Sequence, residues 1–369
     1  MSLFITDIRV RHFTIPLEPP FKPSWDHQVR TRFSSTIVEV QTNEGLIGYG
    51  SGDAMLGFDE FKHLFIGQEV SQMERHSDVL TTLAFHHARY WPLEIALWDI
   101  LGKVANLPLY RLLGGYSNRV PAYCSTGELH SPAQRAEEVL RLREQGFRAV
   151  KLRMRHDDFW RDLEAVSAVR EAIGDTMEIM VDTNQAWKMP GDPRRPWELK
   201  RALAVARELE RYGVYWLEEP LAHMDYVGLA ELRRSTSLRI AVGELNRDIA
   251  DFREYSLRGC ADVLQPDIVI CGGFSQGLKV AHLCQQFGLL FSPHTWGNGI
   301  GLAANLHLAA ATGLCPFVEY PLDPPGWTAE RRDFMLAKPI QITSNGDLEL
   351  TEKPGLGIEL REDLDQFEV

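Results

Sequence analysis

Three short apolar runs of the sequence, MEIMVDTN (177–184), VYWLEEP (214–220) and LRIAVGEL (238–245), pass from a strand-like pattern into a loop at an acidic residue. The acidic residues at these three points are Asp182, Glu218 and Glu244. Strands of a closed parallel barrel end together on one rim, where the catalytic groups of such barrels gather. Three converging carboxylates suit a hard divalent cation such as Mg²⁺, which takes oxygen ligands and keeps positions open for a substrate. The sequence therefore predicts a metal-dependent enzyme.

Two later apolar runs also carry a polar residue at or near the point where the strand-like pattern ends. ADVLQPD ends at Asp267, and LLFSPHT carries His294 close to its end. With the three acidic residues above, chemically capable side chains follow five successive strand-like runs, and this regularity favours a common site.

The region from about residue 120 alternates strand-like and helical patterns, which predicts a (β/α)₇β TIM-like barrel over residues 116–339. Eight strand-like runs begin near Val120, Phe147, Met177, Gly213, Leu238, Ala261, Gly288 and Pro316. The helical segments between them have charged faces, and in the first of these Ser131 is suited to the N-cap and Pro132 to the first turn. An open doubly wound sheet is the alternative, but it usually draws its site from fewer strands.

Residues 1–115 have a different pattern, typical of an N-terminal α+β capping domain. ITDIRVRHFTIPL (5–17) and SSTIVEVQTNEGLIGYGSG (34–52) predict a short antiparallel sheet, with Asn43–Gly45 as a hairpin turn, and helical sequence follows. The tail, residues 340–369, has strand and turn character, and we expect it to fold back on this domain.

The composition is ordinary for a soluble globular protein, with 44% apolar and 24% charged residues among 369. A net charge of −12 disfavours nucleic acid and anionic membranes as partners. The five cysteines are scattered and odd in number, so a reducing cytoplasm is the expected location. We find neither a signal peptide nor a run of the roughly 20 apolar residues that cross a bilayer.

Motifs along the whole chain resemble those of the enolase superfamily, in its mandelate-racemase-like branch. Before the barrel stands EIALWDILGKVANLPLYRLLGG (94–115), and the successive strands carry KLR (151–153), VDTNQAW (181–187), WLEEP (216–220), GE (243–244), QPDI (265–268), SPHTWGNGIG (292–301) and FVEYP (317–321). Each motif alone is weak, but the ordered set at strand ends is specific.

The resemblance implies a role for each of the residues at the strand ends. Asp182, Glu218 and Glu244 correspond to the Mg²⁺ ligands, and the metal would bind a substrate carboxylate and stabilise the charge formed when the α-proton leaves. Asp267 and His294 correspond to the family's dyad, in which the carboxylate orients the imidazole and raises its basicity. His294 would then be the general base.

The second strand departs from the family pattern. Branch members commonly have K-x-K there, whereas this chain has Lys151 and Arg153, two residues apart and so on the same side of the strand. An arginine is a poor proton acceptor, so the pair is expected to bind the substrate carboxylate or the enolate oxygen. Glu319 resembles the acid that donates a hydrogen bond to the enolate, which predicts a raised pKa.

Several further residues are candidates for substrate contact. The segment FKPSWDHQVRTR (21–32) is expected to cover the active site, with Trp25, His27 and Arg30 facing a polyhydroxylated ligand. Asn184 follows the first metal ligand by two residues, and His223 follows WLEEP on the same rim. For each loop residue the alternative is an exposed side chain with no role.

One competent base favours β-elimination, so we expect an acid-sugar dehydratase, a hydro-lyase that converts an aldonate or aldarate to a 2-keto-3-deoxy acid. The alternative on the same scaffold is a racemase or epimerase of an α-substituted carboxylic acid, and a more remote one is a non-catalytic sugar-acid-binding paralogue. The resemblance also implies assembly into a homo-oligomer.

Overall fold

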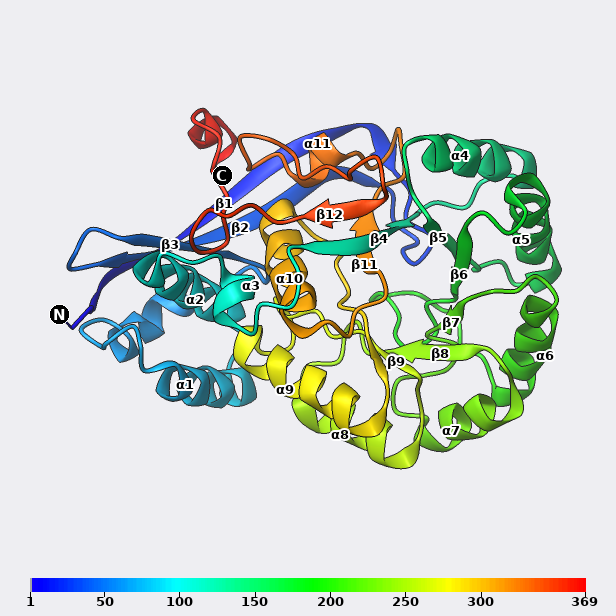
Figure 1. The fold of residues 1–369 in the computed structure, drawn as a ribbon, viewed down its shortest axis with the longest axis horizontal. Helices are drawn as coiled ribbons and strands as arrows, with labels where there is room; N and C mark the ends of the chain where they lie inside the picture. The colour runs from blue at the N-terminus through cyan, green and yellow to red at the C-terminus, as the bar shows by residue number, and fades with distance from the viewer. Residues whose placement is uncertain (1) are drawn as a thin grey trace.

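The computed structural model describes residues 2–369 and has two parts, a barrel and an N-terminal α+β region packed against one side of it (Figure 1). The barrel is a curled sheet of parallel strands with helices on its outer face. The first barrel strand begins at Arg119 and the last ends at Pro321.

Eight strands and seven helices alternate in the barrel. The strands are β4 (Arg119–Ser125), β5 (Ala149–Arg153), β6 (Glu178–Asp182), β7 (Trp216–Glu218), β8 (Arg239–Val242), β9 (Val263–Leu264), β10 (Leu290–Phe291) and β11 (Val318–Pro321). The helices are α4 (Pro132–Glu144), α5 (Phe159–Ile173), α6 (Leu199–Glu210), α7 (Tyr226–Ser235), α8 (Ile249–Arg258), α9 (Gly273–Phe287) and α10 (Gly299–Thr312).

The strand order β11-β4-β5-β6-β7-β8-β9-β10 follows the chain except for β11, which pairs in parallel with β4. Between β10 and β11, the Phe291 amide donates to the Leu314 carbonyl at 3.4 Å and the Ser292 hydroxyl donates to the Phe317 carbonyl at 2.7 Å. The predicted (β/α)₇β architecture is confirmed.

Local sequence explains these elements. All five residues of β5 are buried, because helices cover the outer face of the sheet and side chains fill its interior. α4 begins at the predicted N-cap: the Ser131 hydroxyl accepts a hydrogen bond from the Gln134 amide, and the Gln134 side chain accepts one from the Ser131 amide.

The N-terminal region contains a three-stranded antiparallel sheet in the order β1-β2-β3. Its elements are β1 (Ile5–Phe21), β2 (Arg30–Thr42), β3 (Ile47–Ser51), the 3₁₀ helix η1 (Phe58–Leu64), α1 (Met73–His86), α2 (Trp91–Ala105) and α3 (Leu109–Leu112). Gly45 has a φ of 77° in the predicted turn between β2 and β3, a conformation that glycine adopts without steric cost.

The C-terminal tail contacts both parts of the molecule. It follows α11 (Ala329–Arg332), forms β12 (Asp347–Glu349) and ends with the 3₁₀ helix η2 (Leu364–Phe367). β12 pairs antiparallel with the barrel strand β4, a pairing that the sequence analysis did not predict. Farther along, the Leu356 amide donates to the Asp99 carboxylate on α2.

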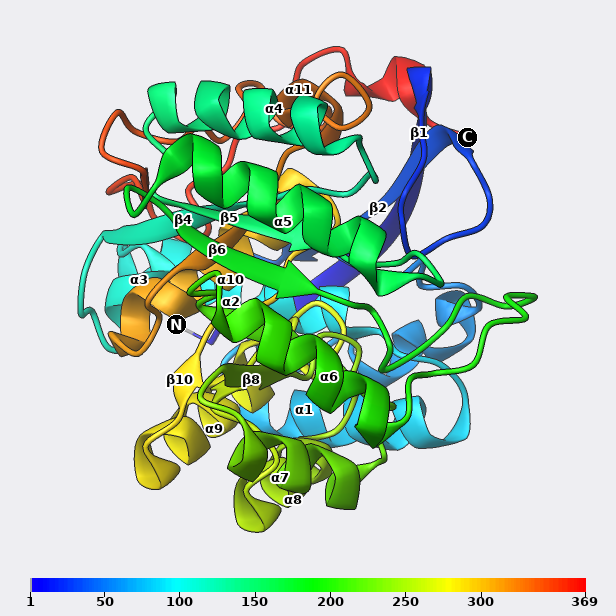
Figure 2. The same ribbon diagram turned by 90° about the vertical axis from the view of Figure 1, so that its right-hand side faces the viewer.

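The two loops that matter for the site lie on the same side of the barrel. Figure 2 shows the loop from β6 to α6 projecting on the side toward which β6 points, with the turn between β1 and β2 beside it. The two loops come together where the Gly191 backbone approaches the His27 ring: a Cβ built at Gly191 would lie 3.7 Å from it. The N-terminal region therefore covers the carboxyl ends of the barrel strands.

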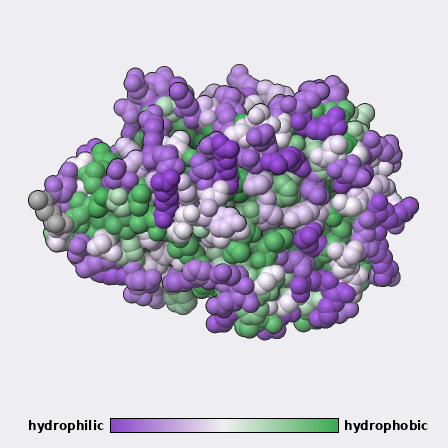
Figure 3. All heavy atoms as spheres, viewed as in Figure 1, coloured by the Kyte–Doolittle hydropathy of each residue, from purple (hydrophilic) through white to green (hydrophobic). Residues whose placement is uncertain are grey.

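On the face drawn in Figure 3, polar side chains dominate over the barrel helices and apolar ones gather over the N-terminal region. Among residues 2–369, none of the helices has the combination of length and apolar character that a bilayer crossing requires.

Candidate active site

A cavity of about 700 Å³ opens at the carboxyl ends of the barrel strands, under the turn between β1 and β2. Seven of the residues that we predicted to act at the site line it: Trp25, Arg30, Arg153, Asn184, His223, Glu244 and His294. The chain thus brings segments separated by more than two hundred residues to one cavity.

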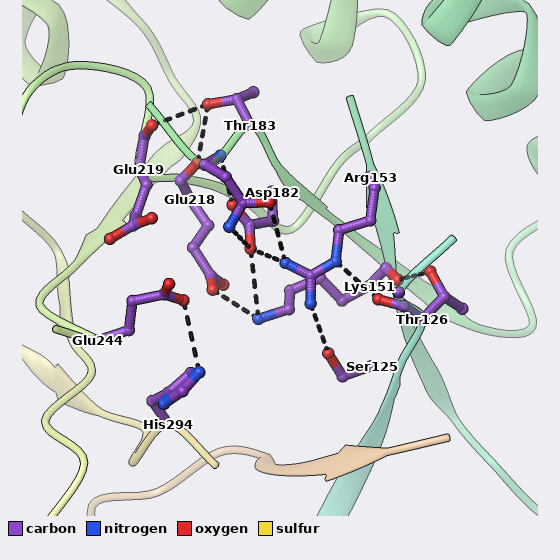
Figure 4. A network of polar contacts seen from close by, with 12 residues as sticks. Ser125, Thr126, Lys151, Arg153, Asp182, Thr183, Glu218, Glu219, Glu244 and His294 are labelled. Atoms are coloured by element: carbon purple, nitrogen blue, oxygen red, sulfur yellow. Dashed lines mark hydrogen bonds and ion pairs between the residues drawn. The ribbon is translucent and has the colours of Figure 1, made fainter. Parts of the chain in front are cut away.

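The three predicted metal ligands come together beside this cavity (Figure 4). Asp182 and Glu218 are the last residues of β6 and β7, and Glu244 follows β8 by two residues. One oxygen from each of the three carboxylates lies within 4.8 Å of the others, and all three side chains are buried. Adjacent parallel strands that end in register produce this convergence.

The electrostatics of the cluster fit a divalent cation. Burial raises the pKa of Glu218 to about 8, with Asp182 adding to the effect and Lys151 opposing it. Burial and Asp182 also raise the pKa of Glu244, against the opposing effect of His294. Buried carboxylates that repel one another are stabilised when a cation neutralises them, and oxygen donors are the ligands that Mg²⁺ takes.

A second group of converging side chains, His130, Glu138 and Asp323, contains no comparable opening for a cation. The Arg135 guanidinium lies among them, 2.8 Å from Asp323 and 2.9 Å from Glu138. His130 in turn lies 2.8 Å from Glu138. Arg135 already balances the charge of these carboxylates, together with His130, whose pKa Glu128 and Glu138 raise to about 9.

His294 and Asp267 form the predicted pair. Nδ1 of His294 lies 3.1 Å from Oδ2 of Asp267, and the other Asp267 oxygen accepts a hydrogen bond from Asn305 at 2.8 Å. With Nδ1 held by this carboxylate, the imidazole faces the site with Nε2, which lies 3.6 Å from Glu244 and 3.7 Å from Glu319. Nε2 is therefore the atom that can exchange a proton with a ligand.

The surroundings of His294 favour its charged form. Burial alone would lower its pKa, but Glu319, Glu244 and the hydrogen bond with Asp267 raise it to about 9. Because Glu244 is among these carboxylates, a cation bound to Glu244 would move the pKa of His294 back toward the range of a general base.

Lys151 lies beneath the carboxylate cluster, fully buried. Its ammonium is 2.5 Å from Glu218, 2.8 Å from Glu319 and 3.8 Å from Asp182. Burial would lower the pKa of Lys151, but these carboxylates raise it well above the ordinary lysine value. Lys151 is thus a buried cation beneath the cluster, and it is not among the residues that line the cavity.

Arg153 lies on the same strand and reaches the cavity. Its guanidinium pairs with Asp182, and Nε donates to the Thr126 carbonyl at 2.6 Å. Two indole rings lie against it, with Trp25 at 4.7 Å and Trp296 at 5.3 Å from the guanidinium carbon to the ring centroid. Aromatic faces and a carboxylate both stabilise the charged form, so Arg153 does not accept a proton.

The predicted raised pKa of Glu319 is wrong. Burial does favour the neutral acid, but the nearby cations Lys151, His294 and Arg153 outweigh it and lower the pKa to about 2. The Glu319 carboxylate instead accepts a hydrogen bond from the Thr295 amide at 2.8 Å. The sequence analysis considered Glu319 only in relation to the enolate, whereas its nearest charged neighbours in the structure are the cations Lys151 and His294, so this side chain accepts hydrogen bonds and pairs with Lys151.

Of the five predicted substrate-contact residues, four line the cavity and one, His27, does not. Asn184 holds Asp182 through two hydrogen bonds of 2.8 and 3.0 Å, and His223 Nδ1 lies 2.9 Å from the Ala186 carbonyl. Arg30 pairs with Asp26 at 3.3 Å. His27 is exposed and is not among the residues that line the cavity.

Sequence reasoning missed other residues that line the cavity, namely Trp187, Lys188, Asn246, Arg247 and Trp296. Trp187 and Trp296 lie inside quoted strand-end motifs, and Lys188, Asn246 and Arg247 follow such motifs by one to three residues. Their positions near strand ends could therefore have indicated that they line the site, but their side-chain types do not form a recognisable motif.

Two family models match the chain, one for each part of the fold. Residues 5–114 match the mandelate racemase / muconate lactonizing enzyme N-terminal domain, and residues 134–364 match the enolase C-terminal domain-like family. Together the two matches span most of the sequence.

Individual relatives differ in the reactions that their names describe. The chain is 31% identical over 345 residues to an arabinonate dehydratase from Saccharolobus solfataricus, covering 88% of this chain and 87% of that protein. It is 32% identical over 294 residues to a hydrophobic dipeptide epimerase from Enterococcus faecalis, covering 75% and 79%.

A solved structure, L-talarate dehydratase from Polaromonas sp. JS666 complexed with Mg and L-glucarate, superposes with a TM-score of 0.86 at 27% identity, over 100% of this chain and 98% of that one. Architecture, family models and relatives agree: the chain belongs to the enolase superfamily and, within it, to the mandelate racemase and muconate lactonizing enzyme family.

Proposed function

We propose that the chain is a Mg²⁺-dependent dehydratase of an acid sugar, an aldonate or aldarate. The observation that carries the proposal is the presence of a single competent base at the cavity. His294 presents Nε2 toward it, Arg153 is a poor proton acceptor, and the fully buried Lys151 is not among the residues that line the cavity. One base supports abstraction of an α-proton and its return on the same side of the substrate.

Asp182, Glu218 and Glu244 are the residues that would hold the metal. Bound there, Mg²⁺ would supply positive charge that stabilises a substrate carboxylate as the α-carbon loses its proton. Arg153 lines the cavity beside this cluster, and its planar guanidinium suits a carboxylate of the substrate. Charge on both sides of the carboxylate would favour the product of proton abstraction.

The elimination then needs an acid for the leaving group. His294 takes the α-proton on Nε2, and the resulting imidazolium, paired with Asp267, returns that proton to the departing β-hydroxyl. The C–H and C–O bonds break, a C=C bond forms and water leaves. The enol product tautomerises to a 2-keto-3-deoxy acid, so atoms and charge balance without a further reactant.

The lining of the cavity supports a polyhydroxylated substrate. Polar side chains come from the start of β2 and from the loops after β6, β7 and β8, including Arg30, Lys188, His223, Asn246 and Arg247. Their donors and acceptors match a chain of hydroxyl groups better than an apolar side chain. The arabinonate dehydratase relative has an acid sugar in its name.

The alternative is epimerisation of an α-substituted acid, and the epimerase relative, at a similar identity, is the observation that favours it. This reaction needs a second base on the other face of the substrate, where Arg153 is a poor acceptor. Incorporation of solvent deuterium at the α-position without loss of water would support epimerisation.

The test is a screen of aldonate and aldarate stereoisomers with Mg²⁺, in which 2-keto-acid product is detected as its semicarbazone. Wild type is compared with His294→Asn, and His63→Asn, an exposed histidine that does not line the cavity, is the control. We expect product from one or a few isomers, lost by a factor of about 10² to 10⁴ in His294→Asn. No product across the full set, with Mg²⁺ bound, would contradict the proposal.

A further inference from the structure

The three carboxylates of the proposed metal site are held in place very unequally. Glu218 accepts hydrogen bonds from Lys151 at 2.5 Å, from Gln265 at 2.8 Å and from Trp216 at 3.0 Å. Glu244, by contrast, accepts a single hydrogen bond within residues 2–369, from the indole Nε1 of Trp187 to its Oε1 at 2.8 Å.

The loop between β6 and α6, which carries Trp187, is fixed just before this residue. The Gln185 amide donates to the Glu219 carbonyl at 2.9 Å, and the Gln185 side chain accepts a hydrogen bond from the Trp197 amide at 3.1 Å. The Ala186 carbonyl accepts one from the His223 amide at 3.2 Å. The backbone thus holds the indole in position.

The ring of Trp187 also packs against an aromatic cluster that the barrel and the N-terminal region share. That cluster consists of Leu17, Phe21, Trp25 and Trp327, with Phe33, Trp187 and Trp296 against it. The indole is half-buried, packs against this cluster and donates its N–H to the carboxylate. The contact connects the turn that covers the cavity to the proposed metal site.

We propose that Trp187 is a positioning residue for the metal: its indole N–H holds Oε1 of Glu244 and leaves Oε2 without a hydrogen bond, ready to bind the cation. Without this donor, the polar contact that remains for Glu244 within residues 2–369 is the ion pair of Oε2 with His294 at 3.6 Å, which does not hold Oε1. Groups that hold metal ligands in place typically change metal affinity 10- to 100-fold when removed. The proposal rests on the proposed metal site and adds to it a residue that does not touch the ion.

The test is Mg²⁺ binding without substrate, by isothermal titration of the full-length chain and its variants. Trp187→Phe keeps an aromatic ring for the cluster and removes only the N–H. Trp197→Phe is the matched control, because Trp197 lies in the same loop, is also half-buried and makes no indole hydrogen bond to a carboxylate. We expect the Kd to rise 10- to 100-fold in Trp187→Phe and to change less than about twofold in Trp197→Phe.

Two further readouts separate positioning from general damage. The thermal midpoint of metal-free Trp187→Phe is expected to match that of Trp197→Phe, whereas the midpoint rise on adding Mg²⁺ is expected to be smaller in Trp187→Phe. Equal Mg²⁺ affinity in Trp187→Phe and wild type would overturn the proposal and leave the proposed function intact. Absence of Mg²⁺ binding by wild type would overturn both.

Discussion

The barrel rim and the junction between the two parts of the molecule both bury carboxylates, but with opposite surroundings. At the junction, Asp99 of α2 accepts hydrogen bonds from the Leu356 amide at 2.8 Å, the Tyr49 amide at 2.9 Å and the Lys103 ammonium at 2.7 Å. At the rim, each carboxylate has two others within 4.8 Å. Donors also reach the rim carboxylates, as Lys151 does at Glu218, but there the carboxylates repel one another, and this repulsion favours a bound cation.

Two buried histidines show the same contrast. His294 faces carboxylates, which raise its pKa to about 9 against the effect of burial. His307 on α10 meets the Tyr110 amide and the Leu356 carbonyl, and burial lowers its pKa to about 4. Burial alone therefore does not identify a functional histidine, and the identity of its neighbours does.

The comparison predicts its largest effect for Glu244→Gln at the rim. This variant is expected to lower Mg²⁺ affinity more than about 100-fold, because it removes a charged ligand and not only a group that holds one. Its metal-free unfolding free energy is expected to stay within about 1 kcal/mol of wild type, since the glutamine oxygen still accepts the Trp187 hydrogen bond. Isothermal titration and urea unfolding measure the two quantities. A large loss of metal-free stability would mean that this carboxylate stabilises the fold as those of the junction do.

The opposite pattern is expected for Asp99→Asn at the junction. The amide group of asparagine must turn a donor toward one of the three donors that now surround Asp99, which is expected to lower the unfolding free energy by about 3 kcal/mol. Mg²⁺ affinity is expected to stay within about twofold of wild type, because Asp99 makes no contact with the rim. Urea unfolding and titration of the same sample check both parts, and a tenfold change in Mg²⁺ affinity would contradict the distinction.

The sequence predicted the ends of the strands well, because the apolar pattern of a strand and the position of the acidic residue after it are local properties of the chain. An apolar run followed by an acidic residue locates Asp182 and Glu218 at the ends of β6 and β7, and barrel topology then brings them together. The spacing of Lys151 and Arg153 likewise predicted that both point to one side of β5.

The rest depended on neighbours that no local pattern specifies. The charge state of Glu319 is set by Lys151 on another strand, 2.8 Å away. The role of Asp99 is set by the Leu356 amide, 257 residues farther along the chain. Such pairings follow from packing of the complete fold, so their consequences were visible only in three dimensions.

The smallest effect in the comparison belongs to His307 and depends on pH. Its folded-state pKa of about 4 lies below the unfolded value of about 6.5, so between these values the unfolded chain binds a proton that the folded chain excludes. Stability is therefore highest above pH 6.5 and falls as the pH drops toward 4, by about 2 kcal/mol between pH 7 and pH 5 from this group. The physical reason is that Nδ1 accepts the Tyr110 amide at 3.0 Å, and a proton there would face that N–H.

The measurement is urea unfolding of wild type and His307→Gln at pH 7 and pH 5. Glutamine cannot titrate, so other groups that respond to pH cancel in the difference between the two proteins. We expect His307→Gln to lose about 2 kcal/mol less than wild type on acidification. His130→Gln is the comparison of opposite sign: Glu128 and Glu138 raise the pKa of His130 to about 9, above the unfolded value of about 6.5, so this variant is expected to lose about 1 kcal/mol more than wild type. Equal losses in wild type and His307→Gln would show that His307 is charged in the folded protein, and the contrast with His294 would fail.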